Sequence, residues 1–152
     1  MGIEKDIQQA SFRNAYQKAS INLIYTVGWM RDKTKSIFEE EDITPQQFNI
    51  LRILRGSFPK PLSTLQIRER MLEKMSDTSR IVDRLIAKGL VKKLTCKDDR
   101  RLVDVIISDK GKKLLEKLDL RQQEMDGVLG NLSENDANIL SELLDKIRGG
   151  SE

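Results

Sequence analysis

Two neighbouring segments, residues 90–96 and 101–108, carry the extended-chain pattern that most restricts how this chain can fold. In the second segment, Val103, Val105 and Ile107 recur at every other position, which places them on one face of a strand. The connection between the segments lacks the Asn-Gly pair of a two-residue turn, so we expect a longer loop. The pattern predicts an antiparallel β-hairpin in this part of the chain.

Helical patterns precede the hairpin. In the N-terminal third, apolar residues recur at spacings of three and four, which predicts one long helix. These residues are Phe12, Tyr16, Ala19, Leu23, Val27 and Met30. A second helix should begin after Thr44, which can act as N-cap, with Pro45 at its first position and Gln47 completing a capping box. Gly56 should end this helix.

Two shorter helices should follow. The sequence Ser-Thr-Leu-Gln at residues 63–66 offers another capping box, and a further helix should run from about Ser76 to Lys88. Gly89 is placed to act as its C-cap. Two short helices separated by a tight connection have the form of a helix-turn-helix.

Two more helices are predicted after the hairpin. Ser108 can cap a long helix, and the sequence at residues 133–136 can cap the last one. Their apolar residues are expected to face inward: Leu114, Leu115, Leu118, Met125, Leu129 and Leu132 in the first, and Ile139, Leu140, Leu143, Leu144 and Ile147 in the second.

This order of elements predicts a mainly α protein with a small antiparallel β-hairpin. It is a winged helix-turn-helix with N- and C-terminal dimerisation helices. We assign residues 37–111 to the winged helix-turn-helix DNA-binding domain, residues 1–36 and 112–148 to a helical dimerisation region, and residues 149–152 to a disordered tail. The apolar residues of the N- and C-terminal helices must be buried against another surface. A second copy of the chain is the simplest candidate for that surface, so we expect a homodimer.

The charge of the chain is unevenly distributed. Residues 60–113 contain 15 lysines and arginines against 8 aspartates and glutamates, whereas the rest contains 12 against 16. The net charge of +3 therefore combines +7 in the middle with −4 at the ends. A basic middle is typical of a nucleic-acid-binding face, and the alternative is a lysine-rich surface that serves solubility alone.

The predicted helix at residues 76–88 has two distinct faces. One polar face contains Asp77, Arg80, Arg84 and Lys88, and an apolar face contains Ile81, Val82 and Leu85. Three hydroxyl residues at its start could donate to phosphates or base edges: Ser76, Thr78 and Ser79. Arg80 or Arg84 could bind guanine O6 and N7, as a recognition helix in the major groove requires. The alternative is a solvated charged face.

The tip of the predicted hairpin carries Arg100 and Arg101. A guanidinium is long, permanently charged and slim enough to enter the minor groove, where narrow A·T stretches concentrate negative potential. Asp99 would repel a phosphate, so we expect it to pair with Arg101 and stabilise the wing. The alternative is an exposed ion pair that contributes little.

The stretch that begins at Asp99 resembles the wing signature of the MarR family of bacterial transcriptional regulators, D-x-R followed by V-x-L-T-x-x-G. Here the matching residues are Asp99, Arg101, Val105 and Gly111, with Ile107 and Ser108 as conservative departures. Residues 79–91 are similar to the family's recognition helix. The resemblance implies a homodimer that binds an operator in double-stranded DNA and is often released by a small ligand, with Arg101 as the wing-tip arginine. Because one dimer binds two half-sites, we expect the operator to be pseudo-palindromic.

Members of that family commonly bind anionic aromatic effectors or oxidants at the junction of the dimer helices and the winged domain. Tyr25, Trp29, Phe38 and Phe48 could line such a pocket, or they could be ordinary core residues. Cys96, the single cysteine, cannot form an internal disulfide, and we expect it to pack rather than to sense oxidants.

Several functions are disfavoured by composition. Histidine is absent, so metal sites and acid–base catalysis lack their commonest group, and we expect neither a metal, a cofactor nor an enzymatic activity. No apolar run is long enough to span a membrane, so we expect a cytoplasmic protein. The sequence predicts a dimeric, sequence-specific DNA-binding transcriptional regulator, a repressor. A winged-helix module that binds protein instead of DNA is the alternative.

Overall fold

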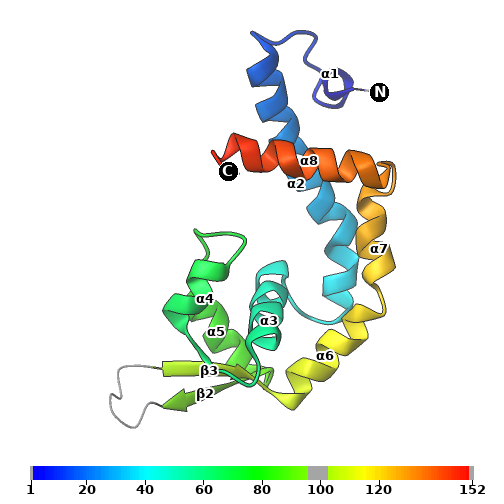
Figure 1. Ribbon diagram of the computed structural model, residues 1–152. Coiled ribbons are helices and arrows are strands. Elements are labelled where there is room, and N and C mark those ends of the chain that lie inside the picture. Colours follow the sequence, from blue (N-terminus) through cyan, green and yellow to red (C-terminus); the bar gives the residue numbers. More distant parts are fainter. Residues whose placement is uncertain (1, 96–102, 151–152) are drawn as a thin grey trace. The chain divides into compact units, whose positions relative to one another are not determined.

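The computed structural model describes residues 2–95 and 103–150 (Figure 1). Its helices are α1 (Ile3–Asp6), α2 (Ala15–Glu40), α3 (Pro45–Ser57), α4 (Thr64–Arg70), α5 (Thr78–Ala87), α6 (Asp109–Asp119), α7 (Gln122–Asp126) and α8 (Glu134–Ile147), with a 3-10 helix η1 (Gly127–Leu129). Its strands are β1 (Leu62–Ser63), β2 (Val91–Thr95) and β3 (Val103–Ile107). The chain is therefore mostly helical with a small sheet, as the sequence predicts.

Local capping signals set where several helices begin. The Thr44 hydroxyl accepts a hydrogen bond from the Gln47 backbone N–H, and the Gln47 side chain accepts one from the Thr44 backbone N–H, both at 3.1 Å. Ser63 with Gln66 and Ser133 with Asp136 form the same reciprocal pair. All three satisfy backbone donors that a helix start leaves without partners.

The sheet has three antiparallel strands in the order β1-β3-β2. Val91 pairs with Ile107 and Thr95 with Val103, so β2 and β3 form the predicted hairpin. The short strand β1 was not predicted; it joins because buried Leu62 pairs with Val105 on the other edge of β3. The alternation in β3 is confirmed, since Val105 and Ile107 are buried in the core.

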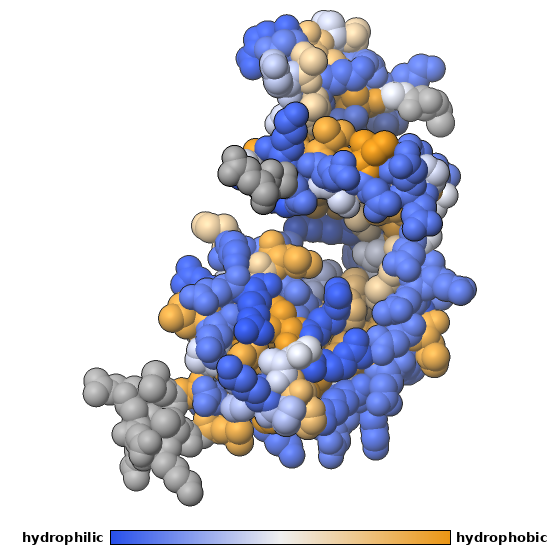
Figure 2. All heavy atoms as spheres, viewed as in Figure 1, coloured by the Kyte–Doolittle hydropathy of each residue, from blue (hydrophilic) through white to orange (hydrophobic). Residues whose placement is uncertain are grey.

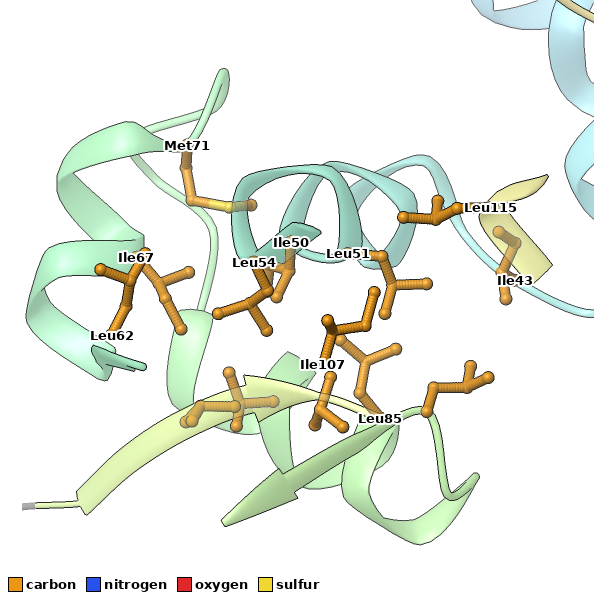
Figure 3. Packing of buried hydrophobic residues seen from close by; sticks show 14 of the residues in the cluster. Ile43, Ile50, Leu51, Leu54, Leu62, Ile67, Met71, Leu85, Ile107 and Leu115 are labelled. Carbon is orange, nitrogen blue, oxygen red and sulfur yellow. The ribbon is translucent and has the colours of Figure 1, made fainter. Parts of the chain in front are cut away.

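Residues 37–126 form one compact unit, and the remaining described residues form a second. In the first unit, side chains from α3, α4, α5, α6 and the sheet converge on a single core (Figure 3). The fully buried side chains include Ile50, Leu51, Leu54, Leu62, Ile67, Leu85, Val105, Leu115 and Leu118. This core fixes the position of α5 against the rest of the winged helix-turn-helix.

The helix predicted to follow Ser108 is interrupted. It ends at Asp119, and the chain turns at Leu120 and Arg121 before continuing as α7 and η1. At the turn, the Arg121 guanidinium binds Glu124 ahead of it and Glu40 at the end of α2, which favours the turn over a continued helix. This turn lies within the compact unit of residues 37–126. Smaller differences are that α3 ends at Ser57 and that α1 was not predicted.

The second unit has little core of its own. Ile3 is the only buried hydrophobic residue among its described residues. Ile139, Leu143 and Ile147, expected to face inward, are exposed within a single chain. Figure 2 shows hydrophobic residues open to solvent over α8. The terminal helices therefore carry apolar surface that one chain leaves uncovered.

Candidate nucleic-acid interface

Helix α5 has one face in the core and one in solvent. Val82 and Leu85 are buried, which confirms the predicted apolar face. Arg80 and Arg84 are exposed on the other side, and neither forms an ion pair with any residue that the structure describes. Asp83 shares the exposed face. Two guanidinium groups that have no ion pair among the described residues, and that lie on the outer face of a helix, can bind an anionic partner.

The start of α5 differs from the prediction. The helix begins at Thr78, and the N-cap is Asp77, whose carboxylate accepts a hydrogen bond from the Arg80 backbone N–H at 3.3 Å. The Asp77 carboxylate thus satisfies a backbone donor, and its negative charge is favourable beside the positive end of the helix dipole. Thr78 is buried, and its hydroxyl donates to the Ser76 carbonyl at 3.5 Å, so it does not share the exposed face with Ser79. Helical spacing alone could not reveal that burial.

Lys88, the C-cap of α5, is turned towards the start of α3. Its ammonium donates to the Gln47 side-chain oxygen at 3.2 Å and to the Asp42 carbonyl, and it lies 3.9 Å from the Asp42 carboxylate. Gln47 is also part of the α3 capping box. Lys88 therefore positions the end of α5 and does not extend the polar face formed by Arg80 and Arg84.

The end of α5 is also attached to the start of α6. Gly89 has φ of +73°, the left-handed conformation that favours glycine and ends a helix. The Ser108 hydroxyl donates to the Gly89 carbonyl at 2.7 Å, and its backbone N–H donates to the Leu90 carbonyl at 3.0 Å. Lys110 donates to the Lys88 carbonyl at 2.8 Å. These bonds join the segment between α5 and β2 to the segment between β3 and α6, next to the end of the recognition helix.

A hollow of about 460 Å³ lies beside the start of α5. Its lining includes Thr64, Leu65 and Arg68 of α4 and Met75, Ser76 and Ser79 around the start of α5. We call it the α4–α5 hollow. Sequence reasoning identified Ser76 and Ser79 but missed Leu65, Arg68 and Met75, because their proximity depends on how α4 packs against α5.

The described part of the wing ends at Thr95 and resumes at Val103. Lys92 and Lys93 of β2 are exposed. Asp99, Arg100 and Arg101, assigned to the wing tip, and Cys96, assigned a packing role, lie outside the described residues. Their assignments stay predictions.

The four aromatic residues proposed for an effector pocket fall into two groups. Phe38 is buried, and its ring centroid lies 5.0 Å from that of Phe48, so this pair belongs to the core of the winged unit. Tyr25 and Trp29 are exposed on α2 in the other unit. A separate hollow of about 330 Å³ adjoins Phe48.

That hollow is lined by two arginines of α3. Arg55 forms two hydrogen bonds to the Asp119 carboxylate, at 2.7 and 3.2 Å, while Arg52 lies 5.7 Å from the centre of the Phe48 ring. Bidentate pairing holds α3 against α6. Arg52 has no such ion pair among the described residues, so its guanidinium is available to bind an anion in this hollow.

Two clusters have shifted acid–base equilibria. Hydrogen bonding to Glu124 is the main cause that raises the pKa of Arg121, and the same bond lowers the pKa of Glu124 below its ordinary value. Hydrogen bonding to Lys18 likewise lowers the pKa of Glu4. All these groups are charged near neutral pH. The Arg121–Glu124 bond lies at the turn after α6, and the Lys18–Glu4 bond joins α2 to α1. Among residues 2–95 and 103–150, no three metal-binding side chains gather at one point, and no helix is long and apolar enough to cross a membrane.

The three-stranded sheet, the core of α3, α4 and α5, and the outward arginines define a winged helix-turn-helix protein. A model of the MarR family matches residues 43–103. The crystal structure of a MarR transcription factor from Planctomyces limnophilus is similar over 92% of this chain and 100% of that chain, with 33% sequence identity and a TM-score of 0.68. The chain therefore belongs to the MarR family and is a transcriptional regulator.

Other solved structures share the fold at lower identity. A mutant MarR from E. coli complexed with operator DNA has 24% identity and a TM-score of 0.74, covering 83% of this chain and 91% of that chain. The PcaV transcriptional regulator from Streptomyces coelicolor, in complex with its natural ligand, has 20% identity and a TM-score of 0.77, covering 93% and 99%. Among curated proteins, none matches the sequence at a significant level.

Proposed function

We propose that this regulator acts in the cytoplasm as a homodimeric repressor that binds a pseudo-palindromic operator and leaves it when a small aromatic or anionic effector binds. The observation that carries the proposal is the outer face of α5, where Arg80 and Arg84 are exposed without an ion pair among the described residues. In a winged helix-turn-helix, this is the face that enters the major groove. The solved E. coli relative, which is complexed with operator DNA, supports the same use of the fold.

The recognition helix and the wing contact different grooves of the DNA, because the two grooves present different chemical groups. Arg80 or Arg84 reads a guanine edge, whereas Arg100 and Arg101 contact the minor groove and Asp99 stabilises the wing. Ser76 and Ser79 donate to phosphates or base edges near the start of α5. Two half-sites bound by one dimer lie about one helical turn apart, near 34–36 Å.

Dimerisation is supported by the apolar surface of the terminal unit. Ile24, Leu143 and Ile147 are largely exposed in one chain, and isolated domains rarely leave such helices uncovered. A second copy buries them by symmetry.

DNA binding is tested with duplexes selected from a random pool by the full-length protein. Fluorescence anisotropy then measures affinity at several salt concentrations. At least one of Arg80→Ala and Arg84→Ala should weaken binding by roughly 5- to 150-fold per half-site and relax preference at one symmetric pair of positions. Arg101→Ala should weaken binding to all duplexes and flatten the log–log salt slope by about two per dimer.

Arg13→Ala is the matched control, because Arg13 is an exposed arginine of the terminal unit. It should leave affinity and salt slope unchanged. If the parent protein enriches no duplex and shows no salt-dependent binding, the winged helix binds protein instead and the proposal is wrong.

The effector is tested with a panel of aromatic carboxylates. A compound that acts as proposed should raise the unfolding temperature of the free protein and release the selected duplex over the same concentration range. The ligand-bound relative from Streptomyces coelicolor supports this part of the proposal.

A further inference from the structure

Two large apolar side chains are exposed beside the start of the recognition helix. Met75 is 97% exposed, and Leu65 is 64% exposed. They come from different elements, since Leu65 lies in the first turn of α4 and Met75 precedes the N-cap of α5. Both line the α4–α5 hollow, so the packing of the two helices brings them to one place.

The surroundings of this apolar pair are polar and charged. They include the Asp77 carboxylate, which caps α5 by accepting a hydrogen bond from the Arg80 backbone N–H. Ser76, Ser79 and Arg68 line the same hollow, and Arg68 forms no ion pair with any residue in the described ranges. Arg80 is exposed on the next part of α5. One carboxylate faces two guanidinium groups here, those of Arg68 and Arg80, so the balance of charge around the hollow is positive. An uncharged apolar partner would supply no further counter-charge, whereas a DNA duplex supplies phosphates.

The major-groove edge of DNA offers one apolar group, the C5 methyl of thymine. Beside it lies the O4 acceptor, which a serine hydroxyl can bind, and phosphates flank the groove. The hollow presents the complementary set: apolar carbon and sulfur from Leu65 and Met75, hydroxyls from Ser76 and Ser79, and the Arg68 guanidinium.

We infer that Met75, with Leu65 beside it, binds thymine methyl groups in each half-site and thereby selects thymine at a symmetric pair of operator positions. The inference rests on the proposed DNA-binding function and adds a specificity determinant outside the charged face of α5. Contact with the methyl group removes apolar surface of both partners from water, which favours thymine over cytosine and over uracil.

Uracil replacement isolates the methyl group, because deoxyuridine keeps every hydrogen-bonding group of thymidine. The probe is the tightest-binding duplex from the random pool, with deoxyuridine placed at one symmetric pair of thymines at a time. For the parent protein, one pair should weaken binding roughly fifteenfold, about fourfold for each methyl group lost. With Met75→Ser, the penalty at that pair should fall to near one, while Met75→Leu should retain it.

Leu72→Ser is the matched control. Leu72 is 82% exposed in the same α4–α5 connection, yet it does not line the hollow. This variant should show the same uracil penalties as the parent. Urea unfolding should confirm that all three variants fold, because both positions are at the surface.

The outcomes separate the inference from the proposed function. If the parent binds no duplex, the DNA-binding proposal itself fails. If the parent binds but no thymine pair shows a uracil penalty, or the penalty survives in Met75→Ser, the assignment of the hollow to thymine is overturned. A change in sedimentation of Met75→Ser with an unchanged penalty would assign the patch to self-association and also overturn it.

Discussion

Gly111, in the first turn of α6, packs against Leu90 just after the recognition helix, and replacing it with alanine tests that packing. A Cβ atom at this position would lie 2.3 Å from the Leu90 carbonyl oxygen and 2.8 Å from Cγ1 of Ile107. The first contact is with backbone, so it cannot be relieved by a rotamer change. That same Leu90 carbonyl accepts the hydrogen bond from the Ser108 backbone N–H.

The expected magnitude is the difference between two opposing effects. Overpacking of a tight core typically costs about 1–3 kcal/mol, and a clash with a backbone atom belongs at the upper end. Alanine in place of glycine within a helix is favourable by about 1 kcal/mol. We therefore expect Gly111→Ala to lower the free energy of unfolding by about 2 kcal/mol.

Gly56 provides a control with the opposite sign. It lies within α3, it is exposed, and a Cβ atom there would meet nothing within 4 Å. Gly56→Ala should consequently raise the free energy of unfolding by about 0.5–1 kcal/mol.

Urea unfolding followed by circular dichroism measures both variants, at one fixed protein concentration because dimerisation contributes to stability. Gly111→Ala should also weaken duplex binding, since the displaced Leu90 carbonyl belongs to the segment that holds α5. A Gly111→Ala protein as stable as the parent, or stabilised like Gly56→Ala, would refute the reasoning.

The remaining predictions concern the position of α5 and the terminal helices. Lys88→Met should lower the free energy of unfolding by about 1 kcal/mol, because it removes the bonds to Gln47 and Asp42; urea unfolding measures the change. Lys113→Met is the control, because Lys113 is an exposed lysine of α6 with no side-chain partner among the described residues. It should leave the free energy of unfolding unchanged. If both variants lowered that free energy equally, Lys88 would not position the end of α5. Leu143→Lys places a charge on the exposed apolar face of α8 and should shift the protein towards monomer in sedimentation equilibrium at micromolar concentration. An unchanged dimer mass would show that this face is not the interface.

Much of the fold could be predicted from the sequence because its signals are local. Thr44 with Gln47, and Ser63 with Gln66, cap helices through hydrogen bonds between residues three apart. The alternation of Val103, Val105 and Ile107 likewise follows from the geometry of one strand. Such interactions depend on neighbouring residues alone, so the starts of α3 and α4 and the hairpin could be predicted without tertiary information.

Other features depended on contacts between distant residues. The two-residue strand β1 is too short to carry a pattern, and it exists because Leu62 meets Val105. The turn after α6 depends on Arg121 meeting Glu40, far earlier in the chain. No local signal distinguishes these residues from ordinary surface or helix residues.

Some features of the candidate interface could likewise be predicted from the sequence, and others depended on tertiary contacts. The sequence by itself determined the outward arginines of α5, since helical spacing separates Arg80 and Arg84 from Val82 and Leu85. Only the tertiary structure decided that Thr78 is buried, that Lys88 binds the start of α3, and that Leu65 and Met75 share one hollow. The physical reason is that periodicity assigns a residue to a face of its own helix, whereas burial and partners depend on what the rest of the chain packs against that face.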